Sequence, residues 1–212
     1  LLSFSSLYRL TKKSSLSAAT PFLPSLKTLL EDKQLSLAYL LAFCNGFITL
    51  GMYSYLGAYL IEILHVPYTS TGFLLMLFGV MCFLAGYINK YLLKHFSRDH
   101  LVRIGFLSTW AALLLLIFEN TPATLLAIVL LGIGYIFIQS ILASTALHTS
   151  THKGLSSGII GIAIFGGGGL GTYANSLILG TFHFPALILF LLVLESIIVF
   201  ASFKIKISGS AV

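Results

Sequence analysis

The chain has 212 residues, of which 58% are hydrophobic and only 8% are Asp, Glu, Lys or Arg, and its formal net charge is +6. A soluble domain usually has about 25% charged residues, and so few charges could not cover its surface, which excludes that class. The same composition excludes an intrinsically disordered chain, a collagen-like repeat, a disulfide scaffold and a nucleic-acid-binding module. A membrane protein remains, because each helix that crosses a bilayer needs about 20 apolar residues.

The segment before the first long apolar window divides into two parts. Residues 1–8 are mostly apolar and precede three basic residues at positions 9–13, which is the reverse of the order in a signal peptide. We interpret 1–8 as the end of a truncated preceding helix and 9–34 as a cytoplasmic linker. Within the linker we expect a short amphipathic helix from Pro21 to Lys33, with one apolar face formed by Phe22, Leu26, Leu29 and Leu30.

Long windows without Asp, Glu, Lys or Arg follow the linker. Their apolar runs are continuous and do not alternate, which favours helices over the strands of a membrane barrel. The last long window is divided by His183, Phe184 and Pro185. We therefore expect a transmembrane region at 35–203 and a cytoplasmic tail at 204–212, with six transmembrane helices near 35–62, 68–91, 101–118, 123–147, 155–180 and 186–203.

The basic residues support this count of six. All twelve Lys and Arg residues fall in the ends and connections on one side of a six-span bundle. By the positive-inside rule that side is cytoplasmic, so both ends of the chain should face the cytoplasm from the plasma membrane, or from the inner membrane of a Gram-negative cell. The opposite side carries Glu62, His65, Glu119 and His183.

Polar side chains recur at membrane depth in the first and fourth helices. Asn45, Thr49 and Tyr53 follow one another at i, i+4 and i+8, so they share one helix face. Gln139 lies within the fourth helix. Because unsatisfied polar groups are costly in lipid, these four side chains should face protein or a water-filled cavity. Substrate contact and interhelical hydrogen bonding both remain open for them.

Glycines in the second and fifth helices are spaced for close packing. The candidates for helix packing or gating are Gly72, Gly79 and Gly86 in the second helix and Gly158, Gly167 and Gly171 in the fifth. Such seams let backbones approach closely, as static contacts or as sliding surfaces. The run 166–169 has no side chains, and each Gly weakens a helix by about 1 kcal/mol relative to Ala. We therefore expect a bend or local unwinding in that run.

Glu195 is the only acidic residue in the middle of a predicted span. An ionised carboxylate at the bilayer centre costs roughly 2.5–3.5 kcal/mol, so burial favours its neutral form. A neutral carboxyl at that depth could carry a proton, which makes Glu195 a possible proton site. We favour the static alternative, in which it forms a hydrogen bond to a neighbouring helix such as the fourth.

Catalytic and metal chemistry is not favoured. The G-x-S-x-G pattern at 154–158 lacks the strand that precedes a nucleophile elbow. A serine–histidine pair of an intramembrane protease would need Ser156 and His183, which lie at opposite ends of the fifth helix. Cys44 and Cys82 are interpreted as small hydrophobic residues. We expect no enzyme, no metal site and no cofactor.

A short basic loop follows the second helix, with Gly86 before it and then Asn89, Lys90, Lys94, Ser97, Arg98 and Asp99. It resembles the glycine-plus-basic loop motif of the major facilitator superfamily in its second-half copy, except that Lys90 replaces an acidic residue. The glycine-rich fifth helix resembles the eleventh helix of the multidrug and sugar efflux branches. Over about residues 30–205, the chain resembles the C-terminal six-helix half of such a transporter.

The resemblance implies an all-α polytopic membrane protein whose six helices form two inverted three-helix repeats, one half of a twelve-helix transporter. It implies that helices one and four line a central cavity and that helices two and five pack against the N-terminal half. Helices three and six would face lipid. The implied partners are a small-molecule substrate, the lipid bilayer and the N-terminal half, without nucleic acid.

The function implied is secondary active transport by alternating access, with proton-coupled efflux of a small amphipathic compound as the favoured form. Substrate would then be contacted by Asn45, Thr49, Tyr53 and Gln139. Uptake of a nutrient or metabolite by a permease of the same superfamily is one alternative. A permease subunit of a primary transport complex is another, and a membrane-embedded enzyme is the weakest.

Overall fold

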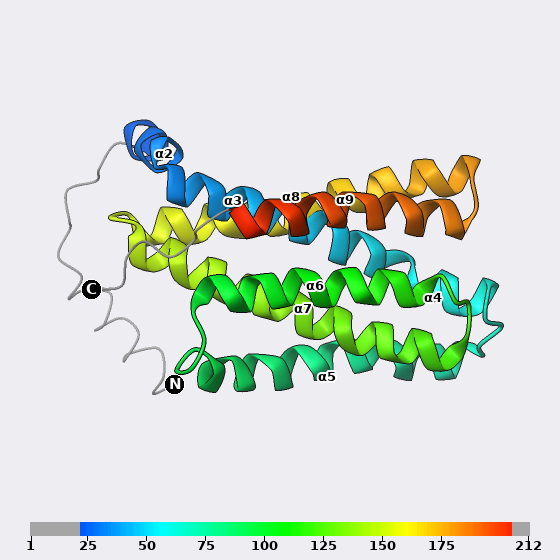
Figure 1. Ribbon diagram of the computed structural model, residues 1–212. Coiled ribbons are helices and arrows are strands. Elements are labelled where there is room, and N and C mark those ends of the chain that lie inside the picture. Colours follow the sequence, from blue (N-terminus) through cyan, green and yellow to red (C-terminus); the bar gives the residue numbers. More distant parts are fainter. Residues whose placement is uncertain (1–21, 205–212) are drawn as a thin grey trace, which may run out of the picture.

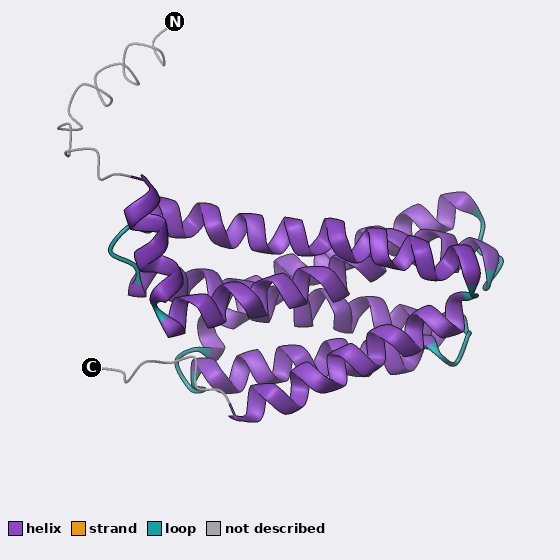
Figure 2. Ribbon diagram, turned by 90° about the horizontal axis from the view of Figure 1, so that it is seen from above, coloured by secondary structure: helices purple, strands orange, loops and turns teal. Residues whose placement is uncertain are grey.

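The computed structural model describes residues 22–204, and all regular structure in that range is helical (Figures 1 and 2). The elements are α2 (Phe22–Glu31), α3 (Lys33–Asn45), the π-helix η1 (Gly46–Leu50), α4 (Gly51–Glu62), α5 (Tyr68–Leu92), α6 (Arg98–Leu116), α7 (Thr121–Thr149), α8 (Lys153–Thr181) and α9 (Phe184–Lys204). The expected helix end at 1–8, the first half of the linker and nearly all of the tail lie outside the described residues.

Six helical segments are long and apolar enough to cross a membrane within the described range. The first span joins α3, η1 and α4 into 30 residues, Lys33–Glu62, and each helix from α5 to α9 supplies one more. The predicted ranges differ from these by at most three residues at either end. The largest difference is at α6, which begins at Arg98, three residues before the predicted start. Its first turn contains charged residues, and the prediction had relied on windows from which charged residues are absent.

Polar side chains fix where three of these spans begin. The Asp32 carboxylate accepts hydrogen bonds from the backbone N–H of Gln34 at 2.8 Å and of Leu35 at 3.1 Å. Ser97 caps α6, and the Asn120 side chain caps α7 by accepting from the Ala123 N–H at 2.9 Å. Each cap satisfies backbone donors that the first helical turn cannot pair internally.

Successive spans run antiparallel, so the bundle has two chemically different ends (Figure 1). One end carries α2, the last turn of α9 and the connections 93–97 and 150–152; we call it the basic end, because every Lys and Arg of the described residues belongs to it. The other end carries the connections 63–67, 117–120 and 182–183. We call it the acidic end, because Glu62 and Glu119 lie there.

Three pairs of packed spans are arranged as two inverted repeats require, and α6 also packs extensively on α7. The first span packs on α8, α5 packs on α7, and α6 packs on α9. If spans one, two and three are exchanged with spans four, five and six, the contact between the first span and α8 becomes the contact between α7 and α5. The contact between α6 and α9 is unchanged by the same exchange. Six spans thus form two inverted three-helix repeats, as the fold class predicted.

The interior consists of two hydrophobic clusters, one toward each end of the bundle. Leu101 and Leu142 belong to the cluster toward the basic end, and Leu56 and Leu116 to the cluster toward the acidic end. Along their helices, three buried polar residues fall between the clusters: Asn45, Thr109 and Glu195. These three side chains place polar groups at mid-depth, between the two apolar clusters, and the candidate site is described from there.

Candidate functional site

The first span changes its helical pitch at mid-length, where Gly46–Leu50 form a π-helical segment. Such segments are rare and are frequent at functional sites. Two predicted substrate-contacting residues lie here. The Thr49 hydroxyl donates to Asn45 Oδ1 at 3.1 Å, and Asn45 Nδ2 donates to the Tyr135 carbonyl of α7 at 3.4 Å. Both side chains are buried, so in this structure they join the first span to α7 from inside the bundle.

The third predicted residue, Tyr53, belongs to an aromatic row across three helices. Its hydroxyl donates to the Leu75 carbonyl at 3.2 Å, and its ring centroid lies 4.4 Å from that of Phe78 on α5. The Phe78 ring lies 5.8 Å from the Tyr135 ring on α7. Tyr53 is half-buried, so part of its ring is accessible beside this row. Tyr53 was predicted from the sequence as a substrate contact, but the sequence gave no indication that its ring would pack against Phe78.

The fourth predicted residue, Gln139, is 6% exposed. Its amide nitrogen and oxygen have no hydrogen-bond partner among the described residues. Asn175 on α8 is in the same condition, and a Cβ added at Gly51 would lie 3.2 Å from Asn175 Nδ2. Sequence reasoning missed Asn175, although an amide in an apolar window is the same signal that identified Asn45.

Asn89 is a second amide that sequence reasoning did not assign to a site. It is 2% exposed, and its Nδ2 donates to the Ser140 hydroxyl of α7. Asn89 had been noted only as part of the basic loop motif. Its side chain in fact links the last turns of α5 to α7 within the bundle.

A glycine seam joins the first span to α8; it consists of Gly46, Gly51, Gly167 and Gly171. A Cβ on Gly167 would overlap the carbonyl oxygen of Phe43, and a Cβ on Gly171 would overlap that of Phe47. From the other side, a Cβ on Gly46 would overlap the carbonyl oxygen of Ile164. The two backbones are therefore in direct contact at the π-helical turn, which only glycine permits.

The helix α8 itself continues without interruption from Lys153 to Thr181. The local unwinding expected in the run 166–169 is therefore wrong, whereas a bend there stays a prediction. Gly167 faces the first span, and a Cβ on Gly168 would lie 3.0 Å from Leu50 Cβ, so packing against η1 supports the run. The irregular backbone lies in the facing span instead.

The other predicted glycines do not contact their own bundle closely. A Cβ on Gly72, Gly79 or Gly158 would meet nothing within 4 Å. A Cβ on Gly86 would make an ordinary contact, 3.7 Å from Ile136. The small-residue groove of α5 thus faces away from the described helices.

Hydroxyl groups connect α4 to α8 beyond the seam, toward the acidic end. Ser54 Oγ and Thr172 Oγ1 lie 3.0 Å apart, and the Tyr55 hydroxyl donates to the Thr172 carbonyl at 3.3 Å. Ser54 is exposed and Thr172 is half-buried. This part of the contact between α4 and α8 therefore lies at an open surface of the bundle.

The possible proton site, Glu195, is 1% exposed on α9. Neither carboxyl oxygen has a hydrogen-bond partner within residues 22–204, so the expected bond to a neighbouring helix is not formed there. The adjacent Ser196 instead accepts a hydrogen bond from Trp110 Nε1 at 2.9 Å, which joins α9 to α6. A proton-carrying role for Glu195 stays a prediction.

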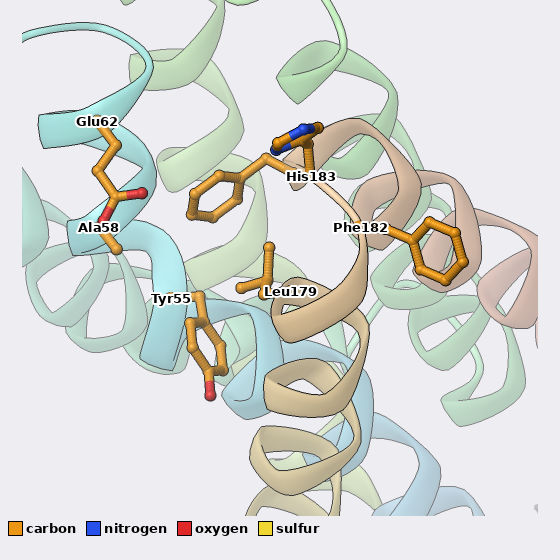
Figure 3. A pocket seen from close by; sticks show the side chains of 7 residues that line it. Tyr55, Ala58, Glu62, Leu179, Phe182 and His183 are labelled. Atoms are coloured by element: carbon orange, nitrogen blue, oxygen red, sulfur yellow. The ribbon is translucent and has the colours of Figure 1, made fainter.

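A pocket of about 270 Å³ opens at the acidic end, between the last turns of α4 and the turn from α8 to α9 (Figure 3). Its lining residues are Tyr55, Ala58, Glu62, Leu179, Phe182, His183 and Phe184. Figure 3 shows Glu62 and His183 on opposite sides of this pocket. Neither was a predicted site residue, although the sequence placed both on the same side of the membrane.

The serine that could have suggested catalysis has a structural role. Ser156 is buried, its hydroxyl lies 2.7 Å from the Tyr39 hydroxyl, and it donates to the Ala146 carbonyl at 2.9 Å. It lies in the first turn of α8, whereas His183 follows the end of that 29-residue helix. At 1.5 Å per residue they are about 40 Å apart, so they form no dyad.

Comparison with known proteins identifies the family. The model of the Major Facilitator Superfamily matches residues 4–172, more than half of the chain. The chain belongs to the Major Facilitator Superfamily. It is accordingly an integral membrane protein of a transporter superfamily, in agreement with its six apolar spans. A search of the curated proteins finds no match.

Among solved structures, the chain resembles FucP, a Major Facilitator Superfamily transporter crystallised in the outward conformation. The TM-score is 0.72 and the sequence identity 19%, over 90% of this chain and 46% of that chain. At this identity the likeness concerns the fold alone. The chain thus spans less than half the length of that transporter.

Proposed function

We propose that the chain is the C-terminal six-helix half of a secondary active transporter of the plasma membrane. The whole transporter would export a small amphipathic compound in exchange for protons, by alternating access. Its N-terminal half, a small-molecule substrate and the lipid bilayer would be the partners of this half. Both ends of the chain would be cytoplasmic, because the basic end of the bundle carries the described Lys and Arg residues.

The glycine seam between η1 and α8 is the observation that carries this proposal. At Gly167 and Gly171 the two backbones touch without interlocked side chains. A contact of this kind can shift along the helix axis without moving side chains out of matching holes, which would let the first span move relative to α8 within this half. The π-helical turn lies at the same level, where the first span can change its direction with the least loss of regular hydrogen bonding.

The open faces of α5 and α8 support the proposal of a second half. Large apolar side chains on these two helices are strongly exposed, among them Phe73, Phe83, Tyr87, Ile162, Phe165 and Tyr173. Contiguous apolar surface of this kind marks a packing partner or lipid. In the proposed transporter, the N-terminal half covers part of these faces, including the α5 groove at Gly72 and Gly79.

The four polar residues remain the proposed substrate contacts. Tyr53 offers a partly accessible ring, and Gln139 has an unpartnered amide. Asn45 and Thr49 are buried and form the hydrogen-bonded pair of the first span. Together they supply hydrogen-bonding and aromatic surfaces at mid-depth, which suits an amphipathic compound.

The test uses the full-length protein in inverted membrane vesicles whose lumen is acidified, with an amine dye reporting the pH gradient. If the protein exchanges a compound for protons, adding ethidium or tetraphenylphosphonium should collapse part of the gradient only in vesicles that contain it. Proton-linked entry of a sugar or amino acid into right-side-out vesicles would instead support the uptake permease. ATP-dependent transport with a copurifying nucleotide-binding subunit would support the primary complex.

A further inference from the structure

The acidic end of the bundle has an electrostatic character that favours cations. Glu62 and Glu119 are its carboxylates, and the part of this end that the structure describes contains no Lys or Arg. Within residues 22–204 the Glu62 carboxylate makes no ion pair and no hydrogen bond. Its charge is therefore available to a ligand in the pocket beside it (Figure 3).

Two aromatic side chains in the walls of the pocket are held in place. The Tyr55 hydroxyl is anchored by its hydrogen bond to the Thr172 carbonyl, which fixes the ring on α4. Phe184 is 5% exposed and packs edge to face against Tyr59, with ring centroids 5.5 Å apart. A carboxylate beside fixed aromatic rings attracts an organic ammonium ion, because the ring faces and the anion both favour positive charge.

We propose that this pocket binds a small organic ammonium ion. Its place at the outer mouth of the transport pathway rests on the proposed function, whereas the binding itself does not. A volume of about 270 Å³ is slightly below the range of pockets that enclose drug-sized ligands, so it suits a head group of the size of trimethylammonium. The nitrogen would lie near Glu62, its methyl groups against Tyr55 and Phe184, and His183 would bind a ligand hydroxyl.

The experiment measures binding to the purified full-length protein by calorimetry, with choline and with its neutral isostere 3,3-dimethyl-1-butanol. Choline should bind, and the isostere should bind at least tenfold more weakly. Glu62→Gln should weaken choline binding at least tenfold, with no effect on the isostere. The matched control is Glu119→Gln, which removes the same charge from the same end but outside the pocket, and should change binding less than twofold.

Equal binding of choline and the isostere, or equal effects of the two Gln variants, would overturn the proposal. Tyr55→Leu removes the aromatic ring and keeps the Glu62 charge, so it should also weaken choline binding. Tyr55→Phe keeps the ring but loses the hydrogen bond that fixes it, so it should weaken binding less than Tyr55→Leu does. Size-exclusion chromatography of each variant confirms that it is folded. Choline binding without proton-linked transport would contradict the proposed function and leave this site standing. Transport with no charge-dependent binding would contradict this site alone.

Discussion

Gly171 of α8 lies directly against the backbone carbonyl of Phe47 in the π-helical turn of the first span. A Cβ at this position would overlap that carbonyl oxygen, whereas a Cβ at Gly169, two residues earlier, would meet nothing within 4 Å. Two glycines that are two residues apart on the same helix therefore have opposite environments. This difference allows the seam to be tested with a matched pair of substitutions.

Gly171→Ala should destabilise the full-length protein, because the added methyl group must push α8 away from η1. Overpacking of this kind costs about 1–3 kcal/mol. Gly169→Ala adds the same methyl group where no described residue lies within 4 Å, so it should destabilise the protein less than Gly171→Ala does. The measurement is the melting temperature of each purified variant, followed by fluorescence-detected size exclusion.

If the two variants melt at the same temperature, the seam is not a close backbone contact in the assembled transporter. The transport rate of Gly171→Ala distinguishes a static packing contact from a contact that moves during transport. If the seam slides, Gly171→Ala should lower the transport rate by more than it lowers the fraction of folded protein. A static seam should lose rate only in proportion to folded protein.

Gln139→Leu distinguishes a substrate contact from a packing role. The amide is buried, and its atoms have no partner among the described residues. An unpartnered buried amide is costly, so an apolar side chain of similar size should keep or raise the melting temperature. If the amide contacts substrate, the same variant should bind substrate about tenfold more weakly. A lower melting temperature with normal affinity would contradict the proposed contact.

Glu195→Gln should transport with a near-normal pH profile. The side chain is buried on α9, and Gln keeps its shape and hydrogen-bonding capacity but cannot exchange a proton. We expect the coupling proton to bind elsewhere, because α9 is implied to be peripheral. The pH dependence of proton-linked transport in proteoliposomes checks this. Abolished coupling with intact substrate binding would instead place Glu195 in the coupling machinery.

The order and number of the spans were predictable from the sequence because lipid acts on local composition. Long continuous apolar runs favour helices, and the positions of the basic residues between these runs restrict how many times the chain crosses the membrane. The same local rule missed the start of α6, where Arg98 and Asp99 belong to the first helical turn. The helix therefore continues beyond its apolar part, and a search for apolar windows cannot detect such an extension.

The site was less predictable because its features depend on contacts between distant segments. Nothing in the sequence of η1 requires a π-helical turn, and its closest partners, Gly167 and Gly171, lie more than 110 residues away. The spacing of the glycines in α8 indicated a close packing contact, but not which neighbouring helix the glycine face would contact. Similarly, Glu62 and His183 were predicted on one side of the membrane, and only the turn from α8 to α9 brings them to the same pocket.

Alternating access is tested most directly with single cysteines at Ser54 and Ser144, in a full-length protein that lacks Cys44 and Cys82. Ser54 is exposed on α4 toward the acidic end, and Ser144 is half-buried on α7 toward the basic end. We predict that conditions which increase maleimide labelling at position 54, such as adding ethidium or changing the pH gradient, decrease it at position 144. Labelling that rises and falls together at both positions, or never changes, would contradict alternating access.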